Sequence, residues 1–194
     1  VLSTACHQLA QWQSMGLPPV RVGVNISPIQ FKRQDIASLV ESLIEETGLD
    51  PQLLDLEITE SAIMDDVDKA VAMLNRINSL GVKLSIDDFG TGYSSLSQLR
   101  QFPFKTLKID RSFVNHINEN AGDKAIVTAI IAMAHSLDQT VIVEGLETKE
   151  QLSIMRHLRC NEMQGFLFSA PQPAEKMTEM LRQGRCLDDG SSDG

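Results

Sequence analysis

The sequence predicts an α/β protein whose parallel strands form a (β/α) barrel. Apolar, strand-like runs alternate with helix-like segments six times along the chain, which is typical of a parallel sheet. A polar residue stands at or near the end of every predicted strand: Asn25, Glu57, Asp87 with Asp88, Lys108, Glu144 and Gln164. In a (β/α) barrel these ends form the active-site face. A doubly wound open sheet is the alternative, but it would gather polar residues at a single switch point.

The individual elements are predicted from apolar spacing and from glycine and proline turns. Strands are expected at 21–27, 53–60, 82–86, 105–110, 140–144 and 163–165, and helices at 3–15, 35–47, 65–80, 94–100, 123–137, 148–158 and 171–184. Ser3 is expected to cap the first helix, Ser27-Pro28 to break the first strand, and Gly48 to stop the second helix. Residues 1–184 are interpreted as one domain and 185–194 as a disordered tail or linker.

Composition narrows the class of protein and of partner. The 194 residues are 42% hydrophobic and 22% charged, enough for one domain with a sizeable core. A net charge of −9 argues against a DNA or RNA polymer as partner, but it is compatible with a small phosphorylated ligand bound through metals. The cysteines (Cys6, Cys160 and Cys186) are odd in number and far apart, so a reducing, cytoplasmic location is expected. The four histidines all lie in helix-like stretches, so histidine-based chemistry is unsupported.

The stretch DDFGTGYSSL (87–96) carries the strongest chemical signal. Asp87 and Asp88 are adjacent carboxylates at the end of a core strand, where one would take up a proton unless a cation lies between them. The alternative is local, with Asp88 capping the next turn and Asp87 bonding loop amides. Together with Asn25 and Glu57 they form an all-oxygen set that favours Mg²⁺ or Mn²⁺. Two such ions bridged by Asp87 could activate a water for displacement at phosphorus.

The other polar residues each have a functional and a structural interpretation. Lys108 could orient the water or neutralise phosphate charge, or it could form a structural ion pair with the acidic cluster. Glu144 could be a general base or a metal ligand, whereas Glu147 would support the site from outside it. Glu60 could cap the following helix or hold the glycine-rich turn. Gln164 could simply satisfy backbone groups.

Six motifs in this order resemble those of one known family: NISP (25–28), EITES (57–61), DDFGTGYSSL (87–96), LKID (107–110), VEGLET (143–148) and MQGFLFSAP (163–171). Together they are similar to the successive motifs of the EAL-domain family of cyclic di-GMP phosphodiesterases. The resemblance implies a TIM-type barrel with an antiparallel first strand. It also implies Mg²⁺- or Mn²⁺-dependent hydrolysis of one phosphodiester of cyclic di-GMP to linear pGpG.

The resemblance also implies a role for each matching position. Metal ligands are implied at four residues: Asn25, Glu57, Asp87 and, for the second ion, Asp88. The water would be held or activated by two residues, Lys108 and Glu144, and the metal site supported by Glu147 and Gln164. Glu60 would anchor the DDFGTGYSSL loop, which in this family links dimerisation to metal binding. A homodimer is therefore expected.

The chain departs from the family in containing no Glu-Ala-Leu triplet, whose glutamate is a metal ligand in the family. We therefore expect an N-terminally incomplete EAL domain that lacks about two strands and is inactive or insoluble alone. Sensor or diguanylate cyclase domains, or a membrane anchor, are expected in the parent protein. Two other functions remain open: a degenerate module that senses cyclic di-GMP without cutting it, and a purely structural dimerisation domain.

Overall fold

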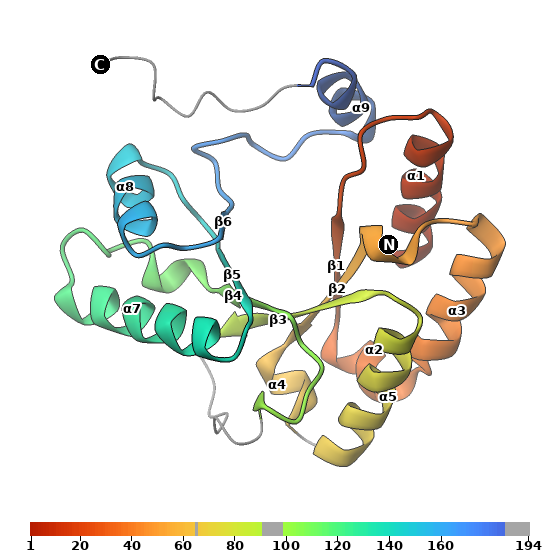
Figure 1. Ribbon diagram of the computed structural model, residues 1–194, viewed down its shortest axis with the longest axis horizontal. Helices are drawn as coiled ribbons and strands as arrows, with labels where there is room; N and C mark the ends of the chain where they lie inside the picture. Colours follow the sequence, from red (N-terminus) through yellow and green to blue (C-terminus); the bar gives the residue numbers. More distant parts are fainter. Residues whose placement is uncertain (65, 91–98, 185–194) are drawn as a thin grey trace.

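The computed structural model describes residues 1–64, 66–90 and 99–184, and its strands form one parallel sheet. The strands are β1 (Val22–Ile26), β2 (Leu54–Thr59), β3 (Lys83–Phe89), β4 (Thr106–Ile109), β5 (Thr140–Val143) and β6 (Glu162–Met163). They pair side by side in chain order, with β1 and β6 at the edges. Figure 1 shows this sheet curled into a half-barrel with the helices around its outside. The barrel-type fold is confirmed, and the doubly wound alternative is wrong because the strand order never reverses.

Most helices lie between consecutive strands, as the alternating pattern predicts, while the first and the last lie before β1 and after β6. They are α1 (Leu2–Ser14), α2 (Pro28–Arg33), α3 (Ile36–Thr47), α4 (Glu60–Ile63), α5 (Val67–Ser79), α7 (Ala121–Ser136), α8 (Lys149–His157) and α9 (Ala174–Arg182), with 3₁₀ turns at Pro51–Leu53 and Arg111–Phe113. The helix expected at 94–100 falls mostly outside the described residues, and so does the tail at 185–194. Within the described segments, no helix is both long enough and apolar enough to cross a bilayer.

One expected helix start is wrong, and one helix at an expected break was not predicted. Ser3 does not cap α1, which begins at Leu2 with Val1 as an N-cap that makes no side-chain bond. Ser27-Pro28 ends β1 but also starts α2, because the Ser27 side chain accepts from the backbone N–H of Gln30. Proline is tolerated in a first helical turn, where its missing N–H would have no partner. Ser27-Pro28 therefore ends the strand as expected and also begins a helix. Gly48 ends α3 as expected, in the left-handed conformation.

The core lies between the sheet and the helices. Alternate residues of β2, β3, β4 and β5 are fully or nearly fully buried on the side that the helices cover: Leu54, Leu56, Ile58, Leu84, Ile86, Leu107, Ile109, Val141 and Val143. The intervening positions point to the opposite, concave face because side chains alternate along a strand. That face carries Asp55, Glu57, Ser85, Asp87, Thr106 and Lys108. The half-barrel therefore has an apolar outer layer and a polar inner surface.

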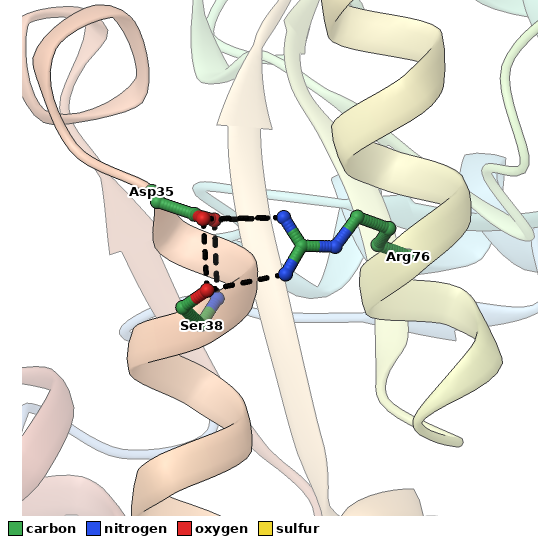
Figure 2. A network of polar contacts seen from close by, with 3 residues as sticks. All are labelled: Asp35, Ser38 and Arg76. Carbon is green, nitrogen blue, oxygen red and sulfur yellow. Dashed lines mark hydrogen bonds and ion pairs between the residues drawn. The ribbon is translucent and has the colours of Figure 1, made fainter.

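Polar contacts between helices fix the outer layer. Asp35 caps α3 by accepting from the Ser38 backbone N–H at 3.1 Å, and it also binds the Arg76 guanidinium of α5 at 3.2 Å. Figure 2 shows Arg76 reaching both Asp35 and Ser38 across the two helices. A second contact joins the first and the last helix. The Trp12 indole of α1 donates to the Thr178 hydroxyl of α9 at 2.8 Å, and the two helices lie beside one another in Figure 1. Cys6 and Cys160 are buried free thiols, whereas Cys186 lies outside the described residues.

Candidate functional site

The strand register brings the predicted polar residues together at the carboxyl ends of the strands. Asn25 of β1 lies opposite Glu57 of β2, and Asp87 of β3 lies opposite Thr59, two residues further along β2. Lys108 of β4 and Glu144, directly after β5, continue the same edge. Because the carboxyl ends of parallel strands meet at the same edge, residues far apart in sequence become neighbours here.

Lys108 is the centre of this group. Its ammonium lies 2.6 Å from Glu57 Oε2, 2.6 Å from Glu144 Oε1 and 3.7 Å from Asp87 Oδ1. The Lys108 side chain is only 4% exposed, while those of Glu57, Asp87 and Glu144 are 14%, 12% and 24% exposed. The lysine therefore forms a buried ion-pair network that joins three strands.

The pKa directions follow from this geometry. Burial alone would lower the pKa of Lys108, but hydrogen bonds to Glu144 and Glu57 outweigh it and raise that pKa above its ordinary value. Burial raises the pKa of Glu57, and the hydrogen bond from Lys108 only partly opposes it. The two directions are compatible because one ammonium is shared among several carboxylates, so none of them receives its full stabilisation.

A bulge accounts for the placement of the two adjacent aspartates. Between β3 and β4 the register runs from Ile86↔Leu107 to Phe89↔Ile109, so β3 holds one extra residue there. Asp88 has a φ of +54°, in the left-handed region that non-glycine residues rarely adopt. Regular strand alternation is therefore interrupted at the aspartate pair. Burial, followed by the charges of Asp87, Asp110 and Glu144, raises the pKa of Asp88, and the charge of Lys108 partly opposes this.

The donor chemistry of this edge fits a hard divalent cation. Asn25, Glu57, Asp87 and Asp88 offer only oxygen ligands. Asp87 Oδ1 is buried and accepts no hydrogen bond, since the Lys108 ammonium at 3.7 Å is too distant to donate one. Across the described residues, however, no three histidine, cysteine or carboxylate side chains are arranged to hold an ion. Glu57 and Glu144 instead close on Lys108.

Glu60 and the start of the DDFGTGYSSL loop are in direct contact. Glu60 begins α4, is 3% exposed, and accepts a hydrogen bond from the Gly90 N–H at 3.3 Å. Gly90 has a φ of +95°, which glycine adopts without strain. Residues 91–98 lie outside the described segments. Anchoring of the whole loop by Glu60 therefore stays a prediction.

The segments after β5 and β6 are joined through their main chains. The Gln164 N–H donates to the Val143 carbonyl at 2.8 Å, and the Leu146 N–H donates to the Gln164 carbonyl at 3.1 Å. The side chains of Asn25, Glu147 and Gln164 are exposed, in contrast to the group around Lys108. The structure thus brings Glu57, Asp87 and Glu144 together on Lys108 and leaves these three amide or carboxylate groups facing solvent.

Three neighbours of the site were not predicted. Ser85 donates to the Asp55 carboxylate at 2.8 Å, and both are buried beside the site on the concave face. Gly23 leaves room for Glu57, because a Cβ atom there would overlap the Glu57 carboxylate. The signals were present: Asp55 is two positions before Glu57 and shares its face, and glycine inside a strand often marks a close approach.

Comparison with known proteins gives a consistent family. The EAL domain model matches residues 1–171. The cyclic di-GMP phosphodiesterase NbdA of Pseudomonas aeruginosa is 43% identical over 185 residues, which are 95% of this chain and 24% of that protein. The bifunctional diguanylate cyclase/cyclic di-GMP phosphodiesterase MucR of the same species is 41% identical over 91% of this chain and 26% of its own length. The chain thus spans about a quarter of the length of these relatives.

Solved structures agree with the sequence matches. The PaMucR phosphodiesterase in complex with c-di-GMP superposes with a TM-score of 0.87 and 40% identity, over 91% of this chain and 71% of that one. Klebsiella pneumoniae BlrP1, in a manganese and cyclic di-GMP complex, has a TM-score of 0.77 and 30% identity, over 88% of this chain and 44% of that one. With a family match over nearly nine-tenths of its residues and the same fold as these structures, the chain belongs to the EAL domain family.

Proposed function

We propose that this chain carries the catalytic residues of a cyclic di-GMP phosphodiesterase, which opens one phosphodiester bond to give linear pGpG. The observation that carries the proposal is the convergence of Glu57, Asp87 and Glu144 on Lys108 at the carboxyl ends of neighbouring strands. The named relatives NbdA and MucR support the choice of substrate. One of their solved counterparts, PaMucR, is a c-di-GMP complex.

We further propose Mg²⁺ or Mn²⁺ as the cofactor, with two ions held by Asn25, Glu57, Asp87 and Asp88. Bound divalent cations would lower the pKa of a water and neutralise phosphate charge. The all-oxygen donor set supports this assignment, and so does Asp87 Oδ1, which is buried and accepts no hydrogen bond. So does the manganese complex of BlrP1. Glu147 and Gln164 are proposed to support the metal site, and Glu60 to anchor the DDFGTGYSSL loop.

Lys108 and Glu144 can play different parts in the proposed reaction. A lysine ammonium has three donors and no acceptor, so Lys108 can hold a water or a phosphoryl oxygen but cannot take a proton. Glu144 is the most exposed of the three carboxylates on Lys108, at 24%, and hydrogen-bonds the same ammonium. We assign Glu144 as the general base, within reach of a water that Lys108 orients.

The partners are proposals as well; the comparisons support the substrate and the companion domain, and the homodimer rests on the resemblance of the DDFGTGYSSL loop to that of the family. Cyclic di-GMP is the proposed substrate, and a homodimer the proposed assembly. MucR is named as both a cyclase and a phosphodiesterase, so a diguanylate cyclase or sensor domain is a reasonable companion in a longer protein. The net charge of −9 favours a small, metal-bound phosphate ligand over a nucleic-acid polymer.

Product analysis tests the proposal directly. A complete EAL domain that includes these residues is incubated with cyclic di-GMP and Mg²⁺ or Mn²⁺, and the products are separated by chromatography. We expect pGpG from the wild type, and a loss of about 100-fold or more with Glu144→Gln. Wild-type binding of cyclic di-GMP without turnover would instead support the sensor function. The absence of both binding and turnover would overturn the whole assignment.

A further inference from the structure

Gln151, in the first turn of α8, makes more contacts than a helix cap requires. It is 5% exposed. Its Oε1 accepts hydrogen bonds from the N–H groups of Glu147 at 2.8 Å and Thr148 at 3.0 Å. Its Nε2 donates to the Val114 carbonyl at 3.2 Å. One buried amide thus connects two main-chain segments that are more than thirty residues apart.

The comparison with α2 shows what is unusual here. Both helices begin with a capping box, Ser27 with Gln30 and Thr148 with Gln151. Gln30 is exposed, and its side chain bonds the Ser27 main chain and hydroxyl. Gln151 is buried and extends beyond its own cap to Glu147 and to Val114. The extra bonds are therefore not explained by capping alone.

The two segments that Gln151 joins both lead to the candidate site. Glu147 lies three residues after Glu144, in the loop that follows β5. Val114 closes the 3₁₀ turn that follows β4, the strand that carries Lys108. The same two segments also meet directly after the two strands, where the Glu144 N–H donates to the Ile109 carbonyl at 3.2 Å.

Close packing leaves the loop after β5 little freedom between the Glu144–Ile109 hydrogen bond and the Glu147–Gln151 hydrogen bond. Gly145 has a φ of +76°, and a Cβ atom on it would overlap Arg111 of the 3₁₀ turn. The loop therefore lies directly against the segment after β4. A shift of the loop at its Gln151 end would be passed to Glu144, because the intervening residues are already in contact.

We propose that Gln151 is a positioning residue, which fixes the 144–148 loop against the segment after β4 and thereby sets Glu144 relative to Lys108. This inference rests on the proposed phosphodiesterase function. Gln151 touches neither the substrate nor the reacting atoms; it acts through the main chain of Glu147 and Thr148. Its loss should therefore affect turnover more than substrate binding, because a misplacement of about 1 Å can cost about 100-fold in rate.

The chain offers a matched control in Gln139. This glutamine is also buried, at 8% exposed, and its Nε2 also donates to a main-chain carbonyl at 3.2 Å. Its acceptor, Phe104, precedes β4, so the contact lies at the opposite end of the sheet from the site. Gln151→Met and Gln139→Met each remove a buried amide, but Gln139 Oε1 has no hydrogen-bond partner, so Gln139→Met removes one hydrogen bond and Gln151→Met removes three. Only Gln151 lies on the path to Glu144.

The test uses both variants in a complete EAL domain with cyclic di-GMP and Mn²⁺. We expect only Gln151→Met to lower kcat, by about 10- to 100-fold with little change in KM. The thermal midpoint of each variant is measured alongside, so that a loss of kcat is compared at known stability. Amide hydrogen exchange at Glu147 and Thr148 should accelerate in Gln151→Met alone. Equal kcat in the two variants would overturn the proposal even if exchange accelerates.

The exchange measurement keeps this inference separate from the proposed function. If the wild-type domain forms no pGpG, the proposed function fails. In that case retained protection at Glu147 and Thr148 in Gln151→Met would also overturn the positioning role. Lost protection would uphold the anchoring of the loop by Gln151 while leaving the phosphodiesterase assignment refuted.

Discussion

Removal of the Lys108 ammonium is the most direct perturbation of the candidate site. The change Lys108→Met keeps most of the side-chain length and removes the charge. The ammonium now lies 2.6 Å from Glu57, 2.6 Å from Glu144 and 3.7 Å from Asp87. The variant removes all three ion-pair contacts. We expect the variant to be less stable in the absence of divalent metal, because three partly buried carboxylates lose the ammonium that contacts all of them.

The size of the effect follows from burial. Removing one partner of a buried ion pair costs about 3–5 kcal/mol in the free energy of unfolding. Glu57 and Glu144 are 14% and 24% exposed, so solvent compensates part of the loss. The lower end, about 3 kcal/mol, is the better estimate. Each kcal/mol lowers the Tm of a domain of this size by about 2–4 °C, so the expected fall is about 6–12 °C.

Thermal unfolding in a chelator, followed by circular dichroism, measures this loss. Lys105→Met is the control, because Lys105 is exposed and stands directly before the same strand. A surface change of that kind shifts the free energy of unfolding by about 0.5 kcal/mol or less. If Lys108→Met is as stable as Lys105→Met, the carboxylates do not depend on the ammonium, and the charge balance argued for this site is wrong.

Three further predictions concern the surrounding structure. Asp88→Ala should be about 1 kcal/mol less stable than Asp88→Gly in urea unfolding, because only glycine adopts a φ of +54° freely. Gly165→Ala should lower stability by about 1–3 kcal/mol in the same assay, because the new Cβ would overlap the Leu146 backbone. Hydrogen bonds from Ser38, and then from Arg76, lower the pKa of Asp35 from 3.8 to about 2. The advantage of wild type over Asp35→Asn should therefore be complete at neutral pH and fade as the pH falls from about 4 to 2; an advantage that persists at pH 2 would contradict this.

Much of the fold was predictable because the local signals were strong and periodic. Strands such as 53–60 alternate apolar and polar residues, and glycines mark where helices stop. The short helices α2 and α4 were not predicted. Ser27-Pro28 signals either a break or a helix start, and only the reciprocal bonds between Ser27 and Gln30 decide which. Glu60 was assigned to the end of a strand, but it opens a one-turn helix, whose length is too short for a periodic pattern.

The candidate site was predictable as a set of residues but not as a geometry. The position of each polar strand end follows from the sequence, whereas the convergence on Lys108 depends on strand register, which is a tertiary property. The bulged residue itself is an aspartate and not a glycine, so the sequence does not single it out, although aspartate tolerates the left-handed region better than most residues. Gln151 follows Thr148 at capping-box spacing, but its bond to Val114 depends on how α8 packs.

The charge balance at this edge argues that Lys108 and divalent ions act together. Four carboxylates, those of Glu57, Asp87, Asp88 and Glu144, face one ammonium, which leaves a formal excess of three negative charges. One lysine cannot neutralise them, and it lies closest to Glu57 and Glu144, while the buried Asp87 Oδ1 accepts no hydrogen bond. Such an excess is relieved by protons or by cations. Under the proposed function a phosphodiester substrate would add further negative charge, and cations at the aspartate pair would relieve both excesses, while Lys108 contacts Glu57 and Glu144.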